Sequence, residues 1–261
     1  IQVPGGGTQL DISAFPGRLL DLPDGAVLFN GIGNMLYVYQ PDGSSVTNGR
    51  PAIKSVSYNS DGSLHLSGTL FNGISEGACY GDDAQMDSNY PLVRFTDASG
   101  NVRYGRSYNW SSTSVMTGTN IVTTECTIPA GASLTDTIQV VANGIASDGV
   151  SFPIALETPT QNWITSGTRG WGIEKTVTHD GVDAAQSGPV GNNQSSHLET
   201  TVTGPGTVSF WWKVSSETNF DDLRFYVDGN VSNVITGEVD WQFVNVAVGA
   251  GSHTLRWTYA K

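Results

Sequence analysis

The stretch ISEGACYGDDAQMDSNYPLVRF, residues 74–95, is the part of the chain where metal ligands are most concentrated. It contains four acidic residues, including Asp82, Asp83 and Asp87. Calcium takes six to eight oxygen ligands, which carboxylates at short spacing supply together with backbone carbonyls. The spacing is not that of an EF-hand, because the glycine and the final glutamate of that loop are missing. Two interpretations therefore stay open: a calcium site at these three aspartates, or a solvated loop in which they accept backbone N–H bonds at turns.

The same stretch holds one of the two cysteines. Cys79 and Cys126 lie 47 residues apart, which fits neither a CxxC metal site nor a redox motif. A single pair of cysteines in a secreted β-domain typically forms a disulfide. We therefore predict a Cys79–Cys126 disulfide, with a reactive thiol as the alternative.

Two further groups of carboxylates occur in the C-terminal third. Asp180 and Asp183 lie in the segment HDGVDAAQSG, and Asp221 and Asp222 are adjacent. Paired carboxylates can catalyse glycoside hydrolysis or bind calcium, but aspartates at these spacings also stabilise turns. The turn interpretation is favoured. The four histidines show no pairing typical of metal ligands and are interpreted as structural or exposed: His65, His179, His197 and His253.

The tryptophans are the candidates for ligand binding. Trp163, Trp171 and Trp241 lie beside predicted turns, where an indole can stack on a sugar ring or close the edge of a β-sandwich. Trp211 and Trp212 are neighbours on a predicted strand and must point to opposite faces of the sheet. One of them is therefore expected in the core.

Composition and charge limit the classes of function and fold. With 12 basic and 24 acidic residues, the formal net charge is −12, so the chain repels phosphate backbones and anionic lipids. No apolar run reaches the length of a membrane span, and neither nucleic-acid binding nor membrane insertion is expected. Abundant glycine, with many β-branched residues, favours short strands and tight turns, and hence an all-β fold.

Turn signals divide the chain into three predicted parts. Residues 1–50 read as a β-meander with Pro-Asp-Gly turns, and residues 51–157 hold about seven strands, the number typical of an immunoglobulin-like sandwich. A polar break that contains Pro159 follows, and residues 158–261 read as a second antiparallel sandwich. Because the chain starts with isoleucine, its N-terminus is expected to be processed or cropped.

The meander resembles a blade of a kelch-type propeller. The residues that match its pattern are Leu20, Leu22, Pro23, Asp24, Gly25, Val27, Val38, Tyr39 and Pro41. Residues 63–147 are similar to the immunoglobulin-like domain that follows the propeller in secreted proteins of the galactose-oxidase type. The sequence segments that show this similarity are GTLFNGISEGACYGDDAQMDSNYPLVRF, YGRSYNWSSTSVMTG and VVANGIASD.

In the copper oxidases of that group, a hairpin of the immunoglobulin-like domain supplies a histidine ligand. The corresponding hairpin here, VRYGRSYNWSSTSV, carries Asn109 and Trp110 and no histidine. The resemblance therefore does not imply copper oxidase activity. No cofactor is expected, apart from the calcium discussed above.

The segment from Trp163 to Lys261 resembles the concanavalin-like jelly-roll modules of large bacterial surface proteins. The matching phrases are THDGVDAAQSG, LETTVTGPGTVSFWWKVSSE, LRFYVDG, EVDWQ and GSHTLRWTY. In that family another strand follows the last of these phrases, so the resemblance implies a jelly roll without its final strand. It also implies contact with glycans or a spacer role.

The sequence-based expectation is thus a secreted or cell-surface bacterial protein that is not an enzyme. It would serve adhesion, carbohydrate contact or extracellular assembly, with a glycan or neighbouring domains and subunits as partners. Two alternatives stay open: a C-terminal accessory part of a larger kelch-type oxidase, and a subunit of an extracellular fibre.

Overall fold

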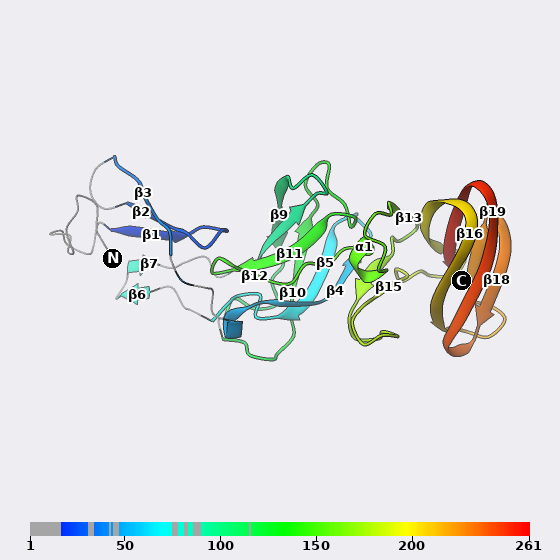
Figure 1. Cartoon of the computed structure of the whole chain (residues 1–261). Coiled ribbons are helices and arrows are strands. Elements are labelled where there is room, and N and C mark those ends of the chain that lie inside the picture. The colour runs from blue at the N-terminus through cyan, green and yellow to red at the C-terminus, as the bar shows by residue number, and fades with distance from the viewer. Residues whose placement is uncertain are drawn as a thin grey trace.

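The computed structural model describes residues 17–30, 34–41, 43, 47–74, 78–80, 83–85, 90–114 and 116–261 (Figure 1). The chain is built from antiparallel sheets, and α1 (Phe152–Ala155) is the one α-helix of the described residues. The predicted all-β class is therefore confirmed. Among the described residues there is no helix with the length and apolar character needed to span a membrane.

The N-terminal part forms a three-stranded meander of β1 (Arg18–Asp21), β2 (Val27–Asn30) and β3 (Tyr37–Tyr39). Its first turn is stabilised as the sequence predicts: Asp24 Oδ1 accepts a bond from the Ala26 amide at 3.0 Å, and Gly25 has a φ of 85°. A two-stranded ribbon consists of β6 (Ala78–Tyr80) and β7 (Asp83–Gln85). The short 3₁₀ helix η1 covers Thr47–Gly49.

A nine-stranded sheet follows, in the order β12-β11-β8-β9-β10-β5-β4-β14-β15. Its strands are β4 (Ala52–Tyr58), β5 (Leu64–Thr69), β8 (Leu92–Thr96), β9 (Val102–Tyr108), β10 (Val122–Thr127), β11 (Thr137–Ala142), β12 (Ile145–Ala146), β14 (Gly172–Glu174) and β15 (Ala184–Gln186). The first half of β9 pairs with β8 and its second half with β10. Alternate residues of β5, β8 and β11 share one core.

Residues from the C-terminal third extend this sheet. Strand β14 pairs with β4, placing Ile173 opposite Val56 and Glu174 opposite Ser55, and β15 pairs with β14 at the edge. The chain on both sides of the polar break near Pro159 therefore contributes to the same sheet.

The last sheet is strongly curled (Figure 1). Its order is β13-β16-β19-β17-β18, with β13 (Trp163–Gly167), β16 (Ser195–Ser215), β17 (Asp222–Val227), β18 (Asn230–Thr236) and β19 (Glu238–Ala260). Strands β16 and β19 stay paired from Ser195–Ala260 to Ser215–Glu238. They turn a corner where the register shifts between Gly204 and Gly206. A Cβ on Gly204 would lie 1.9 Å from the Gly249 carbonyl oxygen, so the backbones can approach this closely only with glycine there.

Beyond the corner, the hairpin of β16 and β19 is the only part of this sheet that continues among the described residues, so a two-stranded layer faces a five-stranded one. The two layers share an aromatic core, in which Phe210 lies 4.8 Å from Phe225 and 5.1 Å from Trp257 between ring centroids. Trp212 is 5% exposed and Trp211 is 46% exposed. The prediction that these two neighbours face opposite sides is confirmed.

The predicted Cys79–Cys126 disulfide is not supported. Cys126 is a free, fully buried thiol, and burial raises its pKa to about 12. Along β10 every second residue faces the core, and Cys126 occupies one of these inward positions, beside Gly105 of β9. Cys79 lies on β6, in a separate two-stranded ribbon, and its side chain is outside the described residues.

Candidate functional site

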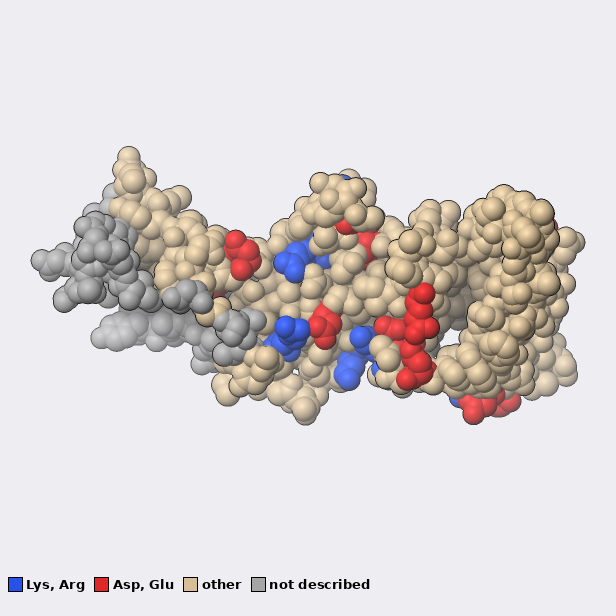
Figure 2. Space-filling model, viewed as in Figure 1, with Lys and Arg blue, Asp and Glu red and all other residues tan. Residues whose placement is uncertain are grey.

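A cleft of about 1190 Å³ lies between the curled sheet and the part of the chain formed by α1, β14 and β15. One wall is the inner face of β16, with Phe210 and Trp212. The opposite wall includes Trp171, Ile173 and Asp183. Figure 2 shows a hollow between the central part of the molecule and the curled sheet.

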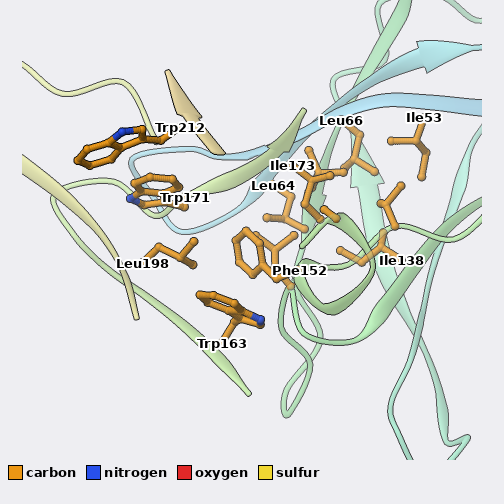
Figure 3. Packing of buried hydrophobic residues seen from close by; sticks show 14 of the residues in the cluster. Ile53, Leu64, Leu66, Ile138, Phe152, Trp163, Trp171, Ile173, Leu198 and Trp212 are labelled. Carbon is orange, nitrogen blue, oxygen red and sulfur yellow. The ribbon is translucent and has the colours of Figure 1, made fainter. Parts of the chain in front are cut away.

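The walls of the cleft rest on one continuous core. Buried side chains run from Ile53 in the nine-stranded sheet, the first sandwich, through Phe152 and Trp171 to Leu198 and Trp212 in the curled sheet, the second sandwich (Figure 3). The two sandwiches are therefore packed together at the cleft, and its shape depends on both.

Two of the three predicted ligand-binding tryptophans are buried in the cleft wall. Trp163 is 7% exposed and its Nε1 donates to Thr158 Oγ1 at 2.9 Å. Trp171 is 6% exposed, and its Nε1 is closed to solvent and has no hydrogen-bond partner among the described residues. A buried donor without an acceptor is costly.

Trp241 belongs to a separate group, which we call the outer aromatic cluster: His179, Trp211, Trp241 and Phe243. His179 stacks on Trp211 at 4.0 Å and meets Trp241 edge-on at 5.7 Å, while Phe243 lies 5.4 Å from Trp211. All four residues border the cleft, on the outer side of the two-stranded layer. The role predicted for the three tryptophans in ligand binding stays a prediction.

His179 was interpreted from the sequence as structural or exposed. It lies on the loop between β14 and β15, and only the tertiary structure brings that loop against β16. No signal in the sequence joins the two.

Asp183 is the most unusual charged group of the cleft. It is 8% exposed, and no hydrogen bond or ion pair within 4 Å reaches its carboxylate from the described residues. Burial raises the pKa of Asp183, and the charges of Asp180 and Glu157 raise it further, against the opposing effect of Lys175. A buried, unpaired carboxylate in a cleft is a marker of functional sites.

The charge of the cleft is acidic. Glu157, Asp180 and Asp183 line it, and Figure 2 shows acidic side chains gathered beside the hollow. The two lysines of its lining already have partners: Lys213 Nζ lies 2.8 Å from Asp240 Oδ1, and Lys261 Nζ lies 3.4 Å from Asp221 Oδ2.

The structure separates the other predicted carboxylate groups. Asp222 binds Arg224 through both oxygens, at 2.7 and 2.6 Å, while Asp221 pairs with Lys261. Asp180 Oδ1 accepts a bond from the Val182 amide at 2.8 Å, the turn role predicted for it. The sequence therefore singled out Asp183 together with three aspartates that have other roles.

The predicted calcium site falls on the part of the chain that is not described. Asp82 and Asp87 lie outside the described residues, and Asp83 is described only as part of the backbone of β7. Within the described ranges, no three His, Cys, Asp or Glu side chains are grouped so as to hold a metal ion.

A polar row crosses the first sandwich and resembles a serine-hydrolase arrangement in its residue types. His65 Nδ1 lies 2.8 Å from Glu125 Oε1, and Ser57 is opposite His65 on the neighbouring strand. Nucleophilic catalysis requires the serine to bond the histidine, and no hydrogen bond joins Ser57 to His65 here. Because Glu125 also accepts a bond from Asn59, the row is a cross-strand polar cluster.

No protein-family model matches this chain, and no curated protein matches it. Among solved structures, the secreted serine protease VesC from Vibrio cholerae matches with probability 1.00, a TM-score of 0.32 and 14% sequence identity. The match covers 80% of this chain and 44% of that chain, so this chain spans less than half the length of that protein.

This finding contradicts two sequence-based predictions. The chain was expected to be a non-catalytic protein for adhesion, carbohydrate contact or extracellular assembly, or else a part of an oxidase or a fibre, and not an enzyme. The structural match is to a secreted protease, which is an enzyme.

Replacing Asp183 by asparagine should raise the thermal stability at pH 7. Because the folded state raises the pKa of this carboxyl, folding is opposed above that pKa, where the carboxylate is charged, and is not opposed below the ordinary value of 3.8, where both states are protonated. We expect Asp183→Asn to raise Tm measurably at pH 7, where each ~1 kcal/mol corresponds to about 2–4 °C in a chain of this size. The gain should disappear as the pH falls toward 3.8.

Thermal melts of the two proteins at a series of pH values would measure this. Asp148→Asn is the matched control, since it makes the same charge change at a carboxylate that is 81% exposed. An Asp183→Asn protein that melts at or below the wild-type temperature at pH 7 would contradict the prediction.

Proposed function

We propose that this chain binds an organic cation in the cleft between its two sandwiches. The observation that supports this proposal most directly is the unpaired carboxylate of Asp183, a buried residue in a cleft with aromatic walls. The ligand would be a larger molecule that carries an ammonium or guanidinium group.

The charge of the Asp183 carboxylate favours a cationic ligand. A carboxylate that is partly shielded from water and has no partner costs free energy, which a cationic ligand would offset by pairing with it. The net charge of −12 and the acidic cleft also attract cations over a distance. Anionic ligands are repelled by the same field.

The aromatic walls support the same class of ligand. Indole and phenyl faces attract cations within about 6 Å of the ring centre, and tryptophan does so most strongly. Six of the chain's seven tryptophans line this cleft: Trp163, Trp171, Trp211, Trp212, Trp241 and Trp257.

Binding of p-aminobenzamidine, an aromatic cation, tests the proposal. Its neutral isostere p-aminobenzamide is the ligand control. We expect calorimetric binding of the amidine to wild-type protein, little binding of the amide, and an affinity for the amidine that falls about tenfold or more in Asp183→Asn, as a hydrogen bond to a charged group predicts. Asp148→Asn should bind like the wild type. Equal binding of amidine and amide, or no effect of Asp183→Asn, would refute the proposal.

We also keep an extracellular or cell-surface location as a proposal. The resemblances of residues 63–147 and 163–261 to modules of secreted proteins support it. Detection of the chain in culture medium or on intact cells would test it.

A further inference from the structure

We infer that the ligand is an extended, basic polypeptide segment that adds a β-strand to the outer edge of residues 207–215 of β16. This inference rests on the proposed function, because it identifies the class of molecule that carries the proposed cationic group.

The edge is available in the part of the chain that the structure describes. Strand β16 pairs with β13 only from Ser196 to Thr200, whereas β19 accompanies it on the other side along nearly its whole length. Within the described ranges, residues 207–215 thus have one neighbouring strand. An exposed edge presents unpaired N–H and C=O groups, onto which an extended peptide can pair.

The cleft follows this edge. Its lining includes every residue from Thr207 to Ser215, both those that point inward, such as Phe210 and Trp212, and those that point outward, such as Trp211. A compact ligand on one face of the strand would border alternate residues only. A cleft that borders all of them runs along the strand edge for about 30 Å, at about 3.3 Å per residue. This length fits an extended peptide of about nine residues.

The opposite side of the cleft is a second strand edge. Strand β15 is the last strand of the nine-stranded sheet, and the cleft lining includes Asp183 and the three residues of β15 that follow it. A peptide in the cleft would therefore lie between two open edges. Asp183 stands at the start of one of them, where it can pair with a basic side chain of that peptide.

The two layers of the curled sheet contain different numbers of strands. In the part of the chain that the structure describes, the five-stranded layer is opposed by two strands, so the inward side chains of β16 face a partly open interior. An added strand would direct alternate side chains into the cleft, against Val208 and Phe210.

The test uses an acetylated nonapeptide of alternating valine and lysine, with two control peptides. One control carries N-methyl groups on alternate backbone nitrogens, and the other has glutamate in place of lysine. We expect the valine–lysine peptide to bind and to slow hydrogen exchange of amides within 207–215 about tenfold. The amides of Asn230–Thr236 in β18, another edge strand of the same sheet, should not change.

The N-methylated peptide should lose at least about tenfold in affinity, because it keeps the charge but cannot pair along its backbone. The glutamate peptide should not bind. Equal binding of the N-methylated peptide, or protection that spares 207–215, would overturn the strand inference. If p-aminobenzamidine binds through Asp183 while the valine–lysine peptide leaves the amides of 207–215 unprotected, the strand inference fails and the proposed function stands. If neither the amidine nor the peptide binds, both the strand inference and the proposed function fail.

Discussion

Trp171→Ala is expected to lower the free energy of unfolding by about 3–5 kcal/mol, the usual cost of removing a large aromatic side chain from a core. Trp171 is 6% exposed and belongs to the buried cluster that joins the first sandwich to the curled sheet. Figure 3 shows it between the core of the first sandwich and Trp212. The cavity left by alanine would lie where the two sandwiches meet.

Urea unfolding followed by circular dichroism would measure the change. Trp171→Phe is the matched control: it keeps most of the buried surface, and since Trp171 Nε1 has no partner, it breaks no hydrogen bond. We expect the phenylalanine variant to lose less than about 1.5 kcal/mol. An alanine variant within about 1 kcal/mol of the wild type would show that Trp171 does not support the interface.

Gly172→Ala is expected to separate β14 from β4 and to cost about 3 kcal/mol, at the upper end of the range for an overpacked site. A Cβ on Gly172 would lie 2.2 Å from the Val56 carbonyl oxygen and 3.0 Å from Ser57 Cα. Because both atoms belong to the backbone of β4, no side-chain rotation can relieve the contact. The pairing of Ile173 with Val56 would be lost, and the wall of the cleft that β14 and β15 form would move.

Hydrogen exchange at the Lys175 amide, which donates to the Lys54 carbonyl at 3.0 Å, would report this separation directly. Gly249→Ala in β19 is the control, since a Cβ there meets nothing within 4 Å. We expect faster exchange and lower stability for Gly172→Ala alone. Similar behaviour of the two variants would contradict the proposed clash.

Features that depend on neighbours along the chain could be predicted from the sequence. The all-β class followed from glycine and β-branched residues, and the turn at Gly25 from the Pro-Asp-Gly pattern, because turn geometry is decided within a few residues. The opposite orientations of Trp211 and Trp212 followed from the two-residue repeat of a strand.

The predicted disulfide is not supported, because a local pattern of cysteines does not decide where each one lies in the fold. The number and spacing of Cys79 and Cys126 carry no information on which strand each occupies or which way it points. The alternation of β10 places Cys126 in the core as a free thiol.

The class of the fold, the turns and the acidic charge follow from the amino-acid sequence, since all of these arise from composition and local pattern. Long-range packing places β14 and β15 in the first sandwich, curls the hairpin of β16 and β19 back on itself, and leaves Asp183 unpaired between them. These features depend on contacts between residues far apart in the chain, where packing and burial, rather than local pattern, set the environment of each side chain.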